Sequence, residues 1–196
     1  PLGHSFPTRR SSDLLIMSKI AFVFSGQGAQ YSGMGKDLYE NITECKEIFQ
    51  KSDSALGFPI SKICFEGTAE ELKSTENAQP AILTMSIAAM TVLVNSGIKP
   101  CAVAGLSLGE YTALVCSGVL DFETAVKLVK KRGKFMEEAV PHGKGAMAAI
   151  LGLNEDEIKD ICSKASEKGI VEPANFNCPG QIVIAGEISA LEYAME

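Results

Sequence analysis

Short apolar runs alternate with amphipathic stretches along the chain from Ile20 onward. The run Ile20–Phe24 is continuously apolar and ends in Ser-Gly-Gln-Gly, which is typical of a buried strand that enters a tight turn. A long apolar helix is expected from Pro80, at its first position, to about Asn95, and a second buried strand is expected over Cys101–Gly105. Strand, helix and strand in this order predict a parallel α/β sheet.

Three further helices are expected in this half of the chain. Thr68 and Glu71 have the spacing of a capping box, which predicts the start of a short helix. A second helix is expected over Glu110–Ser117, and Asp121 is a candidate cap for a third. The apolar stripe of the third helix has Arg132 at its flank, where a long side chain can reach a cleft.

A Pro- and Gly-containing loop at 141–145 is a candidate boundary, so we expect one subdomain over 17–140 and another over 141–196. The expected elements of the second part are a strand, a helix, two strands and the start of a helix: Ala146–Leu151, a helix capped by Asn154, Ile170–Asn175, Gln181–Ala185, and a helix from about Ser189. This order predicts a split, ferredoxin-like unit.

Residues 1–16 are expected to be a non-native extension, readable as a sequencing adapter translated in frame, with natural translation starting at Met17. Arg9-Arg10 resembles a twin-arginine start, but the apolar run after it, Leu14–Met17, is too short for a secretion signal. The best membrane candidate, Ala81–Val94, has only fourteen residues, so no membrane span is expected.

Charge and cysteine content narrow the class of protein further. The 196 residues include 18 basic and 24 acidic side chains, a net charge of −6 without a basic tract, which argues against nucleic-acid binding. The six cysteines are scattered and the histidines are only His4 and His142, so no metal site is predicted. Single cysteines usually behave as small buried apolar residues in a reducing compartment, which favours a cytoplasmic protein.

The strongest chemical signal is Gly-Leu-Ser-Leu-Gly at 105–109, a G-x-S-x-G pattern between an expected strand and helix. In a nucleophile elbow, Ser107 would be the nucleophile and the Leu108 N–H would stabilise an oxyanion at the helix start. The alternative is a simple structural turn. A general base is not evident, since His4 lies in the expected extension and His142 in a loop.

Four segments occur in order along the chain: GQGAQ at 26–30, GLSLGEY at 105–111, KRGKFM at 131–136 and NFNCPGQ at 175–181. Together they resemble the malonyl-CoA:acyl carrier protein transacylase family and the related acyltransferase domains of fatty acid and polyketide synthases. The resemblance implies a parallel-sheet, hydrolase-like large subdomain with an inserted ferredoxin-like small subdomain. Both would be incomplete, because the family's catalytic histidine and further strands lie downstream of Glu196.

The resemblance also implies roles for particular residues. Ser107 would be acylated by malonyl-CoA, as co-substrate, and deacylated by the phosphopantetheine thiol of acyl carrier protein, without a metal or other cofactor. The backbone N–H groups of Gln27 and Leu108 would form the oxyanion hole, and Arg132 would pair with the malonyl carboxylate. The alternative for Arg132 is a surface salt bridge.

Three polar residues match a family segment near the substrate cleft: Asn175, Asn177 and Gln181. They would bind substrate or, as an equal alternative, shape a loop. Leu106 stands where the family often has histidine, a position that is not the usual base.

Two other functions stay open. A serine esterase or hydrolase could use the same elbow, but it would need neither Arg132 nor the Gln27 turn. A non-catalytic fragment that binds acyl-CoA or carrier protein is the alternative from another class, and it suits the 196-residue chain better than the gene behind it.

Overall fold

The computed structural model describes residues 19–140 and 143–196, so the expected extension at 1–16 lies outside the described residues. The chain divides into two compact units, with unit 1 ending at Phe135 and unit 2 beginning at Met136. The last helix of unit 1 continues for a few residues into unit 2.

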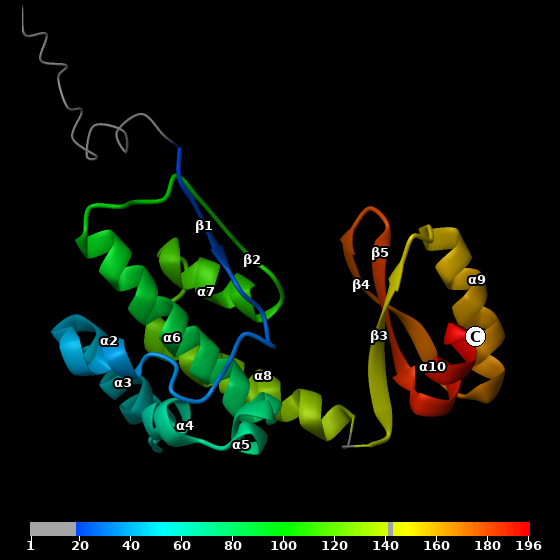
Figure 1. Cartoon of the computed structure of the whole chain (residues 1–196), viewed down its shortest axis with the longest axis horizontal. Helices are drawn as coiled ribbons and strands as arrows, with labels where there is room; N and C mark the ends of the chain where they lie inside the picture. The colour runs from blue at the N-terminus through cyan, green and yellow to red at the C-terminus, as the bar shows by residue number, and fades with distance from the viewer. Residues whose placement is uncertain (1–18, 141–142) are drawn as a thin grey trace, which may run out of the picture. The chain divides into compact units, whose positions relative to one another are not determined.

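Unit 1 is built on a two-stranded parallel sheet of β1 (Ala21–Phe24) and β2 (Ala102–Gly105) (Figure 1). The register sets Phe24 opposite Gly105, so the carboxyl ends of both strands reach the same edge of the sheet. The parallel sheet expected from the sequence is confirmed. The helices of this unit are α2 (Lys36–Asn41), α3 (Thr43–Leu56), α4 (Ile60–Glu66), α5 (Ala69–Lys73), α6 (Thr75–Asn95), α7 (Leu108–Cys116) and α8 (Phe122–Ala139).

Helix α6 forms the centre of unit 1, where it packs against α3, α4, α5 and α7. Its buried side chains belong to two apolar clusters. One cluster includes Phe49 and Ile60, and the other joins Leu83 of α6 to Leu108 of α7 and Val126 of α8. The core of unit 1 therefore includes Leu108, the first residue of α7, which lies just after the end of β2.

Pro80 was expected at the first position of this helix, and that expectation is wrong. Helix α6 begins at Thr75, and the Ser74 carbonyl accepts hydrogen bonds from the N–H groups of Asn77 and Ala78. Pro80 lies inside the helix, at a position where it forfeits one backbone hydrogen bond. The first turns of α6 make tertiary contacts with Gln27, Gly133 and Arg132, and these contacts offset that loss.

The full length of α6 also corrects the estimate used against a membrane span. Among the described residues, α6 is the one helix long and apolar enough to cross a bilayer, with 21 residues rather than fourteen. Half of its most apolar window is buried inside the protein, as in a core helix.

Unit 2 is a three-stranded antiparallel sheet with two helices on one face (Figure 1). The strand order is β3-β5-β4, so β3 and β4 run parallel on either side of β5 and α9 is the crossover between them. This is the split β-α-β arrangement expected from the sequence. Its elements are β3 (Gly145–Leu151), α9 (Glu155–Ala165), a 3₁₀ turn (Ser166–Lys168), β4 (Val171–Cys178), β5 (Gln181–Glu187) and α10 (Ile188–Met195).

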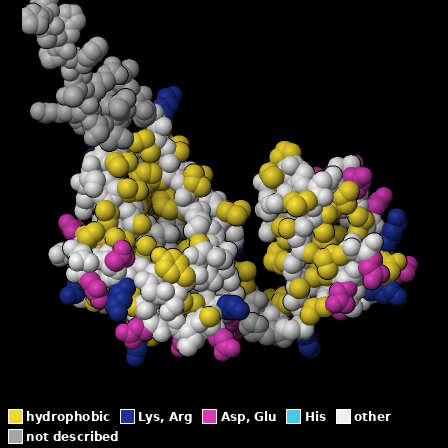
Figure 2. Space-filling model, viewed as in Figure 1, with side chains coloured by type: hydrophobic (Ala, Val, Ile, Leu, Met, Phe, Trp, Pro, Cys, Tyr) yellow, Lys and Arg dark blue, Asp and Glu magenta, His cyan; other side chains and the backbone are white. Residues whose placement is uncertain are grey.

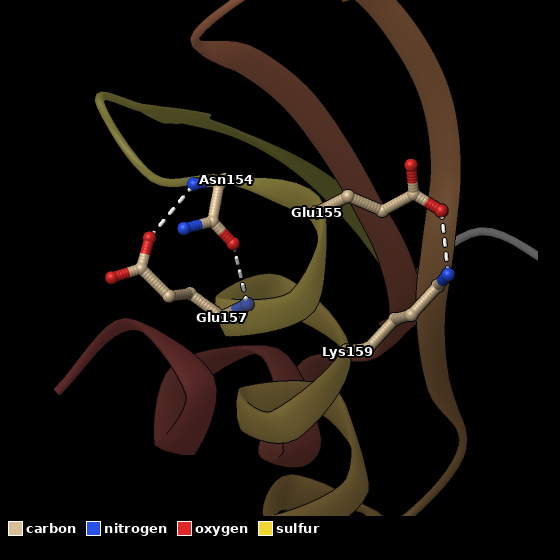
Figure 3. Close-up of polar contacts among 4 residues, drawn as sticks. All are labelled: Asn154, Glu155, Glu157 and Lys159. Carbon is tan, nitrogen blue, oxygen red and sulfur yellow. Dashed lines mark hydrogen bonds and ion pairs between the residues drawn. The ribbon is translucent and has the colours of Figure 1, made fainter.

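The start of α9 is fixed by a reciprocal capping box (Figure 3). The expected cap at Asn154 is confirmed, and the structure adds Glu157 as its partner. The Glu157 N–H donates to Asn154 Oδ1 at 3.0 Å, and the Asn154 N–H donates to Glu157 Oε2 at 2.8 Å. Lys159 pairs with Glu155 one turn further along the helix (Figure 3). The other two caps are confirmed as well, with Thr68 and Glu71 forming a box at α5 and Asp121 accepting from the Thr124 N–H.

Apolar side chains remain exposed on the surface of each unit (Figure 2). In unit 1, Val23 of β1 is 78% exposed. In unit 2, Met147 and Leu151 of β3 are 59% and 69% exposed, while alternate positions such as Ile184 of β5 face the helices. Each sheet therefore has one covered face and one open face.

All six cysteines are free. The expectation of burial holds for Cys45, Cys64 and Cys162, and burial raises the pKa of the Cys64 thiol to about 12. It is wrong for Cys101, which immediately precedes β2, and for Cys178, the last residue of β4, because both are exposed.

Candidate active site

Ser107 lies in the sharp turn between β2 and α7, immediately before the first residue of the helix. Its backbone has φ 53° and ψ −103°, and within the described ranges it is the single non-glycine residue with positive φ. Such strain is costly and is retained mainly where it positions a functional group. The side chain is exposed, so the geometry is that of the nucleophile elbow expected from the sequence.

The two glycines of the elbow allow backbones to approach each other closely. A Cβ on Gly105 would overlap the backbone of Gly109, and a Cβ on Gly109 would overlap the carbonyl group of Phe24. The glycines therefore bring the start of α7 against the end of β1.

Replacing Gly109 by alanine is expected to destabilise unit 1 by about 2 to 3 kcal/mol, because the new methyl group meets rigid backbone of β1. Urea unfolding monitored by circular dichroism measures this difference. Gly97→Ala is the control. Gly97 has φ +87°, and a Cβ there would have no atom within 4 Å, so this substitution costs backbone strain alone. Equal losses in the two variants would contradict close packing at Gly109.

The turn after β1 lies against the elbow. The Leu106 N–H donates to the Phe24 carbonyl at 3.3 Å, and a Cβ on Gly26 would lie 2.9 Å from the Leu106 carbonyl oxygen. The side chain of the next residue, Gln27, donates from Nε2 to Thr75 Oγ1 on α6 at 3.2 Å. The Gln27 turn therefore contacts both the elbow, through backbone, and the beginning of α6, through the hydrogen bond to Thr75.

Leu108, the other expected contributor to an oxyanion hole, is fully buried at the first position of α7. Its side chain packs with Leu83 and Val126 in the core, which fixes the first turn of the helix. An α-helix leaves its first N–H groups without an acceptor inside the helix and carries partial positive charge at this end. Negative charge that develops beside Ser107 would be favoured here.

Arg132 reaches Ser107 from helix α8. Its Nη2 donates to Ser107 Oγ at 2.9 Å, and its Nη1 donates to Oε1 of Gln79 at 2.9 Å. The guanidinium carbon lies 5.5 Å from the centre of the Tyr111 ring, a cation–π distance. Within residues 19–140 and 143–196, Arg132 is therefore bonded to a hydroxyl and an amide, and it does not form the surface salt bridge that was the alternative.

Helix α8 approaches α6 closely beside this contact. A Cβ on Gly133 would lie 2.5 Å from the Thr75 carbonyl oxygen, so a larger residue would push the helices apart. One turn earlier, Lys130 forms an ion pair with Glu76 at 3.0 Å. These contacts fix the position of α8 relative to the beginning of α6, and with it the position from which the Arg132 side chain extends.

Gln79 was missed in the sequence analysis, although it contacts Arg132 directly. It is fully buried on α6, next to Pro80 and among apolar neighbours. The available signal was a long amide side chain at the start of an apolar helix, where a buried polar group needs a hydrogen-bond partner.

The other three candidate residues belong to unit 2. Asn177 donates from Nδ2 to Oε1 of Gln181 at 3.0 Å across the β4–β5 hairpin. Strand β4 extends to Cys178, beyond the expected end at Asn175, and irregular register leaves Asn177 in a bulge. Asn175 is exposed opposite Val183 of β5.

The part of the chain that the structure describes has neither a metal-binding cluster nor a histidine. Residues 19–140 and 143–196 contain no cluster of three or more His, Cys, Asp or Glu side chains arranged to hold a metal. They contain no histidine either, because His4 and His142 lie outside the described residues. A histidine partner for Ser107 is therefore not part of the described site.

The chain is similar to known malonyl transacylases over most of its length. A malonyl CoA-acyl carrier protein transacylase of Bacillus subtilis is 54% identical over 181 residues, which are 92% of this chain and 57% of the relative. A crystal structure of the transacylase of this name from Clostridium perfringens matches with a TM-score of 0.84 and 52% identity, over 91% of this chain and 56% of that one.

A second similar structure contains a malonyl-transacylase in complex with a type II polyketide synthase acyl carrier protein. It matches with a TM-score of 0.82 and 46% identity, over 90% of this chain and 58% of that one. The chain thus spans somewhat more than half the length of these relatives. The family model described as acyl transferase domain matches residues 21–196. The chain belongs to the acyl transferase domain family.

Proposed function

We propose that the protein transfers a malonyl group from malonyl-CoA to the phosphopantetheine thiol of an acyl carrier protein, in fatty acid biosynthesis. The observation that carries this proposal is the 2.9 Å contact between Arg132 Nη2 and Ser107 Oγ at a strained elbow. A nucleophile beside a guanidinium suits an acyl group that ends in a carboxylate. The names and high identity of the B. subtilis and C. perfringens relatives support the same activity.

In the first step, Ser107 Oγ attacks the thioester carbonyl of malonyl-CoA and loses its proton to a general base. The backbone N–H groups of Leu108 and Gln27 stabilise the oxyanion, aided by the positive end of α7. The C–S bond then breaks, and CoA leaves as a thiol after taking up a proton. The product is a malonyl ester of Ser107.

In the second step, the thiol of the carrier protein attacks this ester and gives up its proton. The C–O bond breaks, Ser107 regains its proton, and malonyl-carrier protein leaves. The carrier thiol and CoA use the same site in turn, which is a ping-pong reaction. The similarity to a transacylase–carrier protein complex supports this choice of acceptor.

Arg132 selects the acyl group by exchanging one neutral partner for a charged one. Its guanidinium hydrogen bond to the Ser107 hydroxyl is replaced by a charge-assisted contact to the malonyl carboxylate, which acetyl-CoA lacks. We further propose that Asn175, Asn177 and Gln181 bind substrate. The reaction as written needs no metal and no bound cofactor, and we assign it to the cytoplasm.

The test uses a protein of the relatives' full length that carries this sequence, called the complete protein below. The 196-residue chain is tested beside it. Both are incubated with radiolabelled malonyl-CoA, with and without holo acyl carrier protein. Label on the carrier protein, passing through a labelled enzyme, is the expected result for the complete protein. Release of free malonate alone would favour a hydrolase, and binding without covalent label would favour a non-catalytic module; either result overturns the proposal.

A further inference from the structure

We infer that Gln79 is a positioning residue that fixes the Arg132 guanidinium for recognition of a carboxylate-bearing acyl group. This inference rests on the function proposed above. Its side chain is completely buried on α6, and its Oε1 accepts from Arg132 Nη1 at 2.9 Å. Burial of an amide oxygen is costly unless it is hydrogen-bonded, so the structure strongly favours keeping this bond.

The bond to Gln79 decides where the opposite edge of the guanidinium points. A guanidinium is planar and rigid, so fixing Nη1 sets the direction of Nη2, which lies 2.9 Å from Ser107 Oγ. The Tyr111 ring, 5.5 Å away, restricts the plane further. Arginine otherwise has many rotamers, and holding it in advance removes that entropic cost from substrate binding.

The chemistry of an amide suits this task. A glutamate at position 79 would also accept from Arg132, but its negative charge would offset the positive charge that attracts the substrate carboxylate. A neutral amide oxygen orients the guanidinium and leaves its charge available. Gln79 therefore acts on acyl-group selection through Arg132.

The beginning of α6 also supports the other side of the elbow. Thr75 Oγ1 accepts from the Gln27 side chain at 3.2 Å, and the Thr75 carbonyl lies against Gly133. Thr75 and Gln79 are four residues apart and so share one face of the helix. The first turns of α6 thus connect the Gln27 turn to Arg132 in a single rigid element.

The test compares kcat/KM for malonyl-CoA and acetyl-CoA in the complete protein with holo carrier protein. Gln79→Met, similar in length but without the amide acceptor, is expected to lower the malonyl-to-acetyl ratio by about 10- to 30-fold, mainly through a higher KM for malonyl-CoA. In an Arg132→Ala background the same change is expected to leave the ratio unaltered. A ratio unchanged in the single variant, or a further loss in the double variant, would overturn the inference.

Thr84→Val is the matched control. Thr84 is a buried polar residue on the same helix, and its hydroxyl bonds to Ser52 and to the Pro80 carbonyl, away from Arg132. It is expected to lower the thermal midpoint while leaving the malonyl-to-acetyl ratio unchanged. A drop in that ratio as large as in Gln79→Met would mean that any loss in the α6 core affects selection, and would overturn a specific role for Gln79.

A second measurement does not depend on how the variants fold. Nitrogen-15 NMR of the wild-type protein follows rotation of the Arg132 side-chain nitrogens, and slow rotation about the Cζ–Nη1 bond is expected. Rapid rotation would contradict the inference. Absence of malonyl transfer by the wild type would refute the proposed function instead, so the two failures are distinguishable.

Discussion

Ser107→Ala is expected to abolish malonyl transfer by the complete protein, with a loss of at least about 1,000-fold in kcat. The hydroxyl is the acceptor of the acyl group in the proposed first step, and neither Arg132 nor the helix end can replace it. Covalent label from malonyl-CoA is expected to disappear together with transfer. Intact-protein mass spectrometry measures the first and carrier-protein labelling the second.

Ser117→Ala is the control for this substitution. Ser117 follows α7 at its other end, is exposed, and donates its hydroxyl to the Leu114 carbonyl. It is expected to keep full transfer and labelling. Persistent covalent label in Ser107→Ala would show that another side chain carries the acyl group.

Arg132→Ala is expected to lower kcat/KM for malonyl-CoA by about 100-fold or more, because the substrate carboxylate loses its charged partner. The same change is expected to leave acetyl-CoA turnover within a few-fold, since acetyl makes no such contact. Removal of the guanidinium also leaves the buried Gln79 oxygen without this donor, so some loss of stability is expected. Steady-state kinetics with both thioesters, and thermal unfolding, separate the two effects.

Lys131→Ala serves as the comparison for Arg132→Ala. Lys131 is the preceding residue on α8, exposed, with its ammonium 5.4 Å from the centre of the Phe135 ring. The Lys131→Ala substitution removes one positive charge from the same helix and keeps the Arg132 contact to Ser107. Equal losses for malonyl-CoA in both variants would point to a general effect of charge and contradict a direct contact by Arg132.

Local sequence signals predicted those parts of the fold that depend on neighbouring residues. The elbow between β2 and α7 was predicted from two glycines around Ser107, and the cap of α9 was predicted from Asn154, a residue type that favours helix starts. The approach of Gly105 to Gly109 and the cap at Asn154 each join residues a few positions apart, so the sequence order reveals them. The split arrangement of unit 2 was similarly visible in the order of its elements.

Parts held by distant contacts were predicted less well. Helices α2, α3 and α4 were not expected. They have few buried apolar side chains, such as Cys45 and Phe49 of α3, and these form a core cluster only together with residues of α6. The early start of α6 depends on α8, which approaches Thr75 through Gly133. Gln79 was missed for the same reason, since its partner lies 53 residues away.

The free cysteines offer a practical consequence. Cys101 in unit 1 and Cys178 in unit 2 are exposed, whereas burial raises the pKa of the thiols of Cys45, Cys64 and Cys162. At mildly alkaline pH a maleimide spin label is therefore expected to attach first to one thiol in each unit. Distance measurements by electron spin resonance between those two labels would compare the separation of the units with and without added malonyl-CoA or holo carrier protein.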